Sequence, residues 1–228
     1  MRGIVVNQRE VDQTGGIVYQ AAEKANDLGE PLNFSIRHYE DPHINLGRGL
    51  EELSEVPSDL QFRRPGGGGY VEHDQTFCYG VAIPKEYPKE GLESGRSELG
   101  QQLEELIGDN SSLSPFYDHS DGDIYEIDNG LQILGVGAAD ISEEFGNATV
   151  VRACMYPEVP SSGLYQHGIA DQNIQPVENL ESIRQRLEEG FTEKEVSEFV
   201  SEENMSRSEI LQDESGFRPA EPCFSKAD

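Results

Sequence analysis

Apolar residues recur at helical spacing near the start of the chain. Ile17, Ala21 and Ala25 lie three to four positions apart and would share one face of a helix. This spacing predicts a helix from Gly16 to Leu28, and Gly29 is the expected stop because glycine favours the position just after a helix.

The rest of the chain predicts two more helical regions and a set of short strands. A helix is expected over Glu98–Ile107 with Ser97 as its N-cap. From Val177 a helical stripe returns, followed by a shorter helical piece at Val196–Val200. Alternating apolar and polar residues predict strands, two of them joined by the Asn129–Gly130 step that favours a hairpin. The stripe is Leu180, Ile183, Leu187 and Phe191, and the strands are Gly3–Val6, Phe34–Tyr39, His43–Leu46, Thr76–Ile83, Asp123–Ile127, Leu131–Val136, Ala148–Tyr156 and Gly163–Gln166.

Strands and helices are mixed without a regular βαβ alternation, which predicts the α+β class. We expect one domain over residues 1–175 and a helical extension of the same domain over 176–228, with a flexible tail. A chain of 228 residues is long enough to bury a proper hydrophobic core.

Charge narrows the function classes. The chain has 44 Asp and Glu against 17 Lys and Arg, a net charge of −27, and a pI near 4.3. The acidic residues are spread along the chain, as in a salt-adapted protein whose self-repulsion is screened at high ionic strength. A nucleic-acid partner is excluded because phosphate binding needs a basic surface.

The three cysteines, Cys78, Cys154 and Cys223, are odd in number and lack metal-like spacing. We therefore expect a reducing compartment without structural disulfides, and a buried inert thiol at Cys154. Neither a signal peptide nor a run of transmembrane length is recognisable, so a cytoplasmic protein without a membrane partner is predicted.

The densest chemistry lies in the run from Arg63 to Asp74. Arg63 and Arg64 precede Pro65 and four consecutive glycines, and a His-Asp pair follows after three residues. Glycine lets bare backbone N–H groups approach a ligand, and guanidinium groups bind phosphate or carboxylate. The run predicts a loop that grips an anionic ligand; a plain surface hairpin is the alternative.

This run resembles the ligand-binding loop of the lipoate-protein ligase family, the relatives of biotin protein ligase. Residues 36–48, a strand, a Pro42 turn and a strand ending in Leu46-Gly47-Arg48, resemble a second family motif. Tyr165-Gln166-His167-Gly168 resembles a third. The motifs occur in the family's order over residues 34–170.

The resemblance implies a mostly antiparallel sheet flanked by helices, as in class II synthetases. It implies an enzyme that joins lipoate or octanoate to ATP, with Mg²⁺, as an acyl-adenylate, and passes the acyl group to a lysine. The partner would be a lipoyl domain or the H-type carrier protein of glycine cleavage. A dedicated protein-bound metal is not expected.

The resemblance also implies the site residues. The family's catalytic lysine follows an Asp-Ile pair and a turn, and that position holds Gln132 here; an alternative alignment on Asp140-Ile141 would place Ala148 there. Arg152 on a neighbouring strand is the expected substitute cation. The implied ligand-binding residues are Arg63, Arg64, Gly66, Gly67, Gly68, Gly69, His73, Asp74, Asp123, Gly135, His167 and Gly168.

Two alternative functions stay open, and one further acidic segment needs an interpretation. The protein could be an octanoyltransferase acting from a carrier thioester, with Cys154 or Cys223 as nucleophile, or a degenerate homologue that only binds acyl-adenylate. The acidic segment Asp118–Asp123 has the oxygen density of a calcium loop but misses the EF-hand spacing, so we interpret it as a solvated turn.

Overall fold

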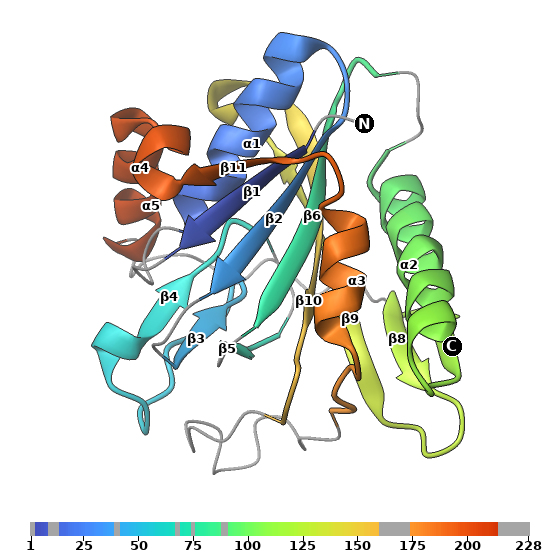
Figure 1. The fold of residues 1–228 in the computed structure, drawn as a ribbon. Helices are drawn as coiled ribbons and strands as arrows, with labels where there is room; N and C mark the ends of the chain where they lie inside the picture. Colours follow the sequence, from blue (N-terminus) through green and yellow to red (C-terminus); the bar gives the residue numbers. More distant parts are fainter. Residues whose placement is uncertain are drawn as a thin grey trace, which may run out of the picture.

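The computed structural model describes residues 3–8, 14–38, 42–66, 69–73, 76–87, 91–159 and 174–213. Helices lie on both faces of a large twisted sheet, and a smaller sheet is placed beside the ends of its central strands (Figure 1). The strands are β1 (Gly3–Gln8), β2 (Leu32–His38), β3 (His43–Leu46), β4 (Gln61–Arg63), β5 (Val71–His73), β6 (Phe77–Pro84), β7 (Pro115–Asp118), β8 (Asp123–Glu126), β9 (Gln132–Ile141), β10 (Ala148–Met155) and β11 (Thr192–Glu195). The helices are α1 (Thr14–Leu28), α2 (Gly91–Asn110), α3 (Leu180–Leu187), α4 (Val196–Phe199) and α5 (Glu202–Asp213), with 3-10 turns at Ser58–Leu60 and Glu143–Phe145.

The large sheet has eight strands in the order β11-β1-β2-β6-β10-β9-β8-β7. The pairs of β1 with β11 and β2 are parallel, and every other pair is antiparallel. The structure therefore confirms the predicted α+β class with a mostly antiparallel sheet flanked by helices.

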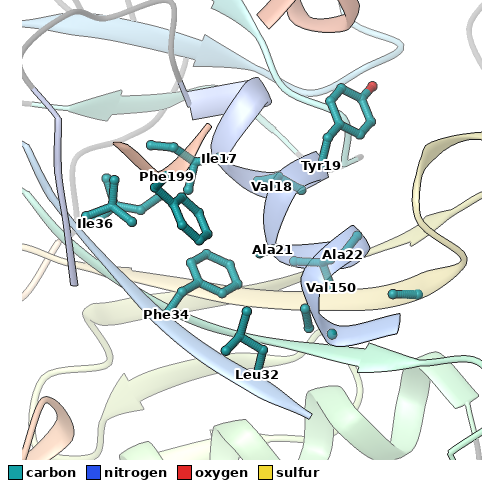
Figure 2. Packing of buried hydrophobic residues seen from close by; sticks show 14 of the residues in the cluster. Ile17, Val18, Tyr19, Ala21, Ala22, Leu32, Phe34, Ile36, Val150 and Phe199 are labelled. Carbon is teal, nitrogen blue, oxygen red and sulfur yellow. The ribbon is translucent and has the colours of Figure 1, made fainter. Parts of the chain in front are cut away.

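Helix α1 covers one face of this sheet, which we call the α1 face. Its apolar stripe packs on Phe34 of β2 and Val150 of β10, and Phe199 of α4 completes the cluster (Figure 2). Ile17 and Ala21 are fully buried in it, as the helical spacing predicts. Gly29 ends the helix with a φ of 64°, a left-handed conformation that glycine adopts without strain.

Helices α2 and α3 cover the opposite face. Leu99, Leu103 and Ile107, spaced four residues apart on α2, are buried against β9 and β10. Gly100 has a specific packing role, because a Cβ there would lie 2.3 Å from the ring of Tyr117 on β7. The missing side chain lets the helix approach the edge of the sheet.

The small sheet has the order β4-β3-β5, with β3 and β4 parallel and β3 and β5 antiparallel. All four residues of β3 are buried, and Ile44 and Leu46 form a separate core with Leu53 and Val56. This sheet positions the two ends of the glycine-rich loop, since β4 leads into the loop and β5 follows it.

The described residues 177–213 belong to the same layers. Strand β11 pairs with β1 at the sheet edge, and α5 packs on α1. Gly15 and Gly16 permit this packing, because added Cβ atoms would lie 2.6 Å from Ser208 Oγ and 2.9 Å from Met205 Sδ.

Several elements differ from the sequence prediction. Helix α2 begins at Gly91, seven residues before the predicted start, and β7, β11 and α5 were not predicted. The predicted strand Gly163–Gln166 lies outside the described residues. Among the helices that are described, none combines the length and the apolar character needed to cross a membrane.

Candidate anion-binding site on the α1 face

Arg64 ties the glycine-rich loop to the small sheet. Its Nη1 donates to the carbonyl of Asn45 at 2.9 Å, and its Nη2 donates to the carbonyl of Gly69 at 2.7 Å. Backbone hydrogen bonds from Arg48 N to Gly66 O and from Gly47 N to Gly69 O fix both ends of the loop. The Arg64 guanidinium therefore holds the loop in place and also contributes a positive charge to it.

Arg63 contacts a different segment of the chain from Arg64. Its Nη1 donates to the carbonyl of Leu50 at 2.5 Å, so the side chain supports the segment that follows β3. Of the two arginines, Arg64 is the one whose charge acts on Arg152 and Tyr156. Arg63 therefore supports the segment after β3, whereas Arg64 both orders the glycine-rich loop and faces Arg152.

Arg152 lies on β10 opposite Gly80 of β6 and Gly137 of β9. Its Nη1 is buried and has no hydrogen-bond partner in the described part of the chain. Burial, and next the charge of Arg64, lower the pKa of this guanidinium to about 10. It stays protonated at neutral pH, and a second cation nearby makes the place attractive to an anion.

The glycine-rich loop lies over the same part of the sheet. A Cβ at Gly66 would be 3.4 Å from that of Ala139, which pairs with Val150 on β10. Val150 and Arg152 are two residues apart on β10, so their side chains point to the same face. The loop and the buried guanidinium therefore lie together on the α1 face.

Two further polar residues lie near Arg64 and Arg152, and the sequence analysis did not identify them. Asn45 is 1% exposed, and its buried Nδ2 has no hydrogen-bond partner among the described residues. Tyr156 is buried and its hydroxyl donates to the carbonyl of Glu72 at 2.8 Å. Burial raises the pKa of Tyr156, and the charge of Glu72 adds to the rise. Asn45 could have been found as the amide between the apolar residues of β3.

Strand β9 forms a floor that is free of side chains. Gly135 and Gly137 point to the same face as Ala139 because they lie two and four residues before it. Gly137 is exposed although it lies within a paired strand, and the nearest atom to a Cβ built on it is a backbone oxygen at 3.8 Å. The floor is open to a ligand at Gly137, whereas at Gly135 a Cβ would lie 3.0 Å from Asp123 Oδ1.

A β-bulge brings Gln132 to the other end of this floor. Leu134 pairs with Ile124 while Gln132 pairs with Tyr125, so β9 has one extra residue here. Ile133 and Leu134 both enter the core on the far face, and Gln132 turns to the side of Gly135. Gln132 Nε2 donates to Asp123 Oδ2 at 2.7 Å.

Gln132 and Arg152 are separate positions. Arg152 pairs with Gly137, and Gly137 is five positions along β9 from Gln132, about 16 Å at the usual strand rise. Arg152 is thus no positional substitute for the lysine that the resemblance expects at residue 132. The structure gives one cationic end at Arg64 and Arg152, and one end at Asp123 and Gln132.

Asp123 has an unusual environment for a carboxylate. Burial, and then the charge of Asp121, raise its pKa to about 6, while Arg96 acts in the opposite direction. Near neutral pH this carboxylate therefore holds a proton part of the time. A cation bound beside it would lower its pKa again.

His73 is almost fully buried, with Nδ1 2.8 Å from Thr76 Oγ1 and its ring stacked on His43. It lies beside Cys78 and Cys154, which form a disulfide between facing residues of β6 and β10. The expectations of a chain without disulfides and of a free Cys154 thiol are therefore wrong. No spacing signal predicts this disulfide, because the two cysteines are 76 positions apart in sequence and only the strand pairing brings them together.

The acidic segment before β8 is a hydrogen-bonded turn. Asp118 Oδ1 accepts from the backbone N–H of Ser120, and Asp121 Oδ1 accepts from that of Asp123. Hydrogen bonds from Ser120 hold the pKa of Asp118 below its usual value. The carboxylates serve the turn itself, which agrees with the interpretation as a solvated turn.

The predicted site residues thus divide into three groups. Arg64, Gly66, Gly69 and Arg152 lie at one end of the floor, with His73 nearby and Arg63 behind the loop. Asp123, Gln132 and Gly135 lie at the other end. Gly67, Gly68, Asp74, His167 and Gly168 lie outside the described residues.

An eight-stranded, mostly antiparallel sheet with helices on both faces and a small sheet beside it defines the class II synthetase-like fold. Solved structures of lipoate-protein ligases share it. A putative lipoate protein ligase from T. acidophilum with bound lipoic acid aligns with a TM-score of 0.61 and 16% identity over 93% of this chain and 95% of that one. Lipoate-protein ligase A bound with ATP aligns with a TM-score of 0.57 and 17% identity over 93% and 95%.

A bipartite lipoate protein ligase from Thermoplasma acidophilum, described with its E2 lipoyl domain, aligns with a TM-score of 0.56 and 16% identity over 93% and 91%. No protein-family model and no curated protein matches the sequence. At these identities the comparison shows the fold, and that fold is the one implied by the motif resemblance.

Proposed function

We propose that this protein is a lipoate-protein ligase-like enzyme that activates lipoate or octanoate with ATP and transfers the acyl group to a lysine of a lipoyl-carrier domain. The observation that carries the proposal is the buried Nη1 of Arg152, which has no hydrogen-bond partner among the described residues and lies beside Arg64 and near Gly66. A site of this kind suits a mixed anhydride of a carboxylate and a phosphate.

In the first step, a carboxylate oxygen of the acid attacks the α-phosphorus of ATP, and pyrophosphate leaves. Negative charge builds up on the oxygens around phosphorus, and preorganised donors stabilise it most. We assign this work to Arg152 and Arg64, with the backbone N–H groups of Gly66 and Gly69 as further donors. Asn45 Nδ2 is a further donor beside Arg64.

In the second step, the amine of the carrier lysine attacks the acyl carbon, AMP leaves, and the amine loses a proton. The open floor at Gly137 suits the acyl chain, because a ligand can lie directly on the strand there.

The neighbouring structures support this assignment by what they contain. One has bound lipoic acid, one has bound ATP, and one is described with an E2 lipoyl domain. An octanoyltransferase with a cysteine nucleophile is less favoured, since Cys154 is in a disulfide. We therefore place ATP-dependent activation first.

The test is the formation of lipoyl-AMP from ATP and lipoate, followed by mass spectrometry, with binding measured by titration calorimetry. Arg152→Ala should lower the rate of adenylate formation about a hundredfold or more, the scale for removing one preorganised charge-stabilising group. Arg186→Ala, on the exposed side of α3, is the matched control and should leave the rate unchanged.

Three outcomes separate the hypotheses. Lipoyl-AMP that depends on Arg152 supports the ligase. Tight binding of acyl-adenylate without turnover indicates a degenerate homologue, and acyl transfer from a carrier thioester without ATP indicates a transferase. Neither binding nor turnover by the folded protein would reject the proposal.

A further inference from the structure

Three side chains beside the candidate site carry the chemistry of a metal centre. The ligand atoms of His73, Cys78 and Cys154 all lie within 4.8 Å of one another. They come from β5, β6 and β10, so three separate strands converge on one point. The proposed acyl chemistry uses neither sulfur.

We propose that the reduced protein binds one Zn²⁺ through His73, Cys78 and Cys154, and that the disulfide seen in the structure is the metal-free state of the same site. Two thiolates and one imidazole are ligands that Zn²⁺ prefers, and three protein ligands leave a fourth tetrahedral position for water or a small ligand.

The surroundings of His73 suit a ligand. Its Nδ1 is hydrogen-bonded to Thr76 Oγ1 at 2.8 Å, which sets the orientation of the ring and leaves Nε2 as the nitrogen for the metal. The His73 ring also stacks on the ring of His43, with centroids 4.9 Å apart. A buried and oriented imidazole loses little freedom when it binds a metal.

The two cysteines are also prepositioned. Cys78 and Cys154 are directly opposed in the β6–β10 ladder, so both sulfur atoms project to the α1 face from a rigid part of the sheet. Cys78 is fully buried and Cys154 is partly buried. The open coordination position therefore lies on the side of Cys154, two residues from Arg152.

Oxidation state decides between the two forms. A dithiol reductant converts the disulfide to two thiols and itself becomes a cyclic disulfide. Zn²⁺ then displaces one proton from each thiol as it binds. A small-molecule disulfide such as oxidised glutathione takes two electrons from the thiolates, restores the cystine and expels the metal.

Cobalt titration of the full chain tests this site, with Cys223→Ser removing the remaining cysteine. After reduction and removal of the reductant, one Co²⁺ per chain should bind with thiolate-to-cobalt charge-transfer absorption, and Zn²⁺ should displace it. The oxidised protein should bind none. His73→Asn should lower the affinity for Co²⁺ at least tenfold. The control is His119→Asn, which replaces an exposed histidine just after β7 and should leave this affinity unchanged.

Protection from alkylation provides a second measurement that needs no change in the core. In the reduced Cys223→Ser chain, Zn²⁺ should slow the reaction of iodoacetamide with Cys154, the partly buried cysteine of the pair, as located by peptide mass. Absence of stoichiometric Co²⁺ binding, equal binding by the oxidised protein, or equal alkylation with and without Zn²⁺ would each overturn the proposal. These measurements do not involve lipoate or ATP, so they are independent of the proposed function.

Discussion

Gln132 occupies the position where the resemblance expects a lysine, and the structure shows what holds it there. Its amide donates to Asp123, and the bulge in β9 turns it to the open side of the sheet. An amide brings a donor without a positive charge, so this end of the floor lacks the charge stabilisation that an ammonium would give.

Gln132→Lys should therefore raise the rate of acyl-adenylate formation. A lysine has similar reach and would place an ammonium between Asp123 and the floor. The same change should lower the pKa of Asp123 from about 6 toward its usual value, because an opposite charge favours the carboxylate. Gln102→Lys on exposed α2 adds the same charge elsewhere and is the control. An unchanged adenylate rate together with a lowered Asp123 pKa would show that the lysine is placed as expected and that its charge is not what limits the reaction.

Asp123 also gives a pH dependence of stability. Its pKa is raised to about 6 in the folded state, so between about pH 4 and pH 6 the folded state binds more protons than the unfolded state. This carboxyl therefore makes stability fall as pH rises through that window. Asp123→Asn removes the titration but keeps an acceptor for Gln132.

Urea unfolding at pH 4 and pH 7 measures the effect. The free energy of unfolding of Asp123→Asn relative to wild type should rise between the two pH values. The exposed control Asp128→Asn should show no such rise. A constant difference for Asp123→Asn would mean that burial does not raise this pKa.

At the scale of elements, the C-terminal segment is anchored through one buried carboxylate. Glu188, at the end of α3, is 9% exposed and accepts from Ser35 Oγ at 2.6 Å and from Arg184 Nη1 at 2.8 Å. Arg37 of β2 adds an ion pair. The anchor joins α3 to β2, the third strand from the β11 edge of the sheet.

Glu188→Ala should destabilise the fold by about 3–5 kcal/mol, because it leaves two guanidinium groups and a hydroxyl without their buried partner. Glu189→Ala changes the neighbouring exposed residue and should cost little. Thermal or denaturant unfolding of both variants decides the point. Equal stabilities would show that Arg37 finds sufficient compensation in Glu193, its other ion-pair partner.

The elements that sequence predicts well are those whose pattern reflects their own burial. The stripe of α1 and the alternation in β10 are of this kind, and so is the Asn129–Gly130 turn. Strand β11 reads Thr-Glu-Lys-Glu, polar throughout, and is a strand only because the edge of β1 pairs with it. The pairing with β1 makes this segment a strand, and the local sequence pattern carries no sign of that pairing.

The same distinction applies to the candidate site. The glycine-rich loop and its arginines are contiguous, so the sequence predicts them as a unit. Three other features depend on strand register. They are the different contacts of Arg63 and Arg64, the distance between Gln132 and Arg152, and the Cys78–Cys154 pair. A register shift of one residue would turn each of these side chains to the other face of its sheet.

At the scale of the whole molecule, charge sets the conditions under which the fold is stable. The chain has a net charge of −27, and three of its nine described arginines, Arg37, Arg184 and Arg207, are engaged in ion pairs. Most of the remaining acidic groups repel one another across the surface. Screening should relieve this repulsion, because the Debye length falls from about 10 Å at 0.1 M salt to about 3 Å at 1 M.

The melting temperature should therefore rise between 0.1 M and 1 M KCl. Each kcal/mol of added stability corresponds to about 2–4 °C for a domain of this size, and we expect a rise of at least that amount. Screening also weakens exposed ion pairs, but such pairs contribute little, while the buried Glu188 cluster is screened much less.

A variant with fewer surface charges separates screening from a general effect of salt. Glu105→Gln, Asp109→Asn and Glu209→Gln together neutralise three exposed acids on α2 and α5. This variant should be more stable than wild type at 0.1 M KCl and should gain less from 1 M, because it has less repulsion to relieve. A rise of the same size in both proteins would point to salt acting through hydration of apolar surface instead. A flat or falling melting temperature would leave the acidity of this chain without a role in its stability.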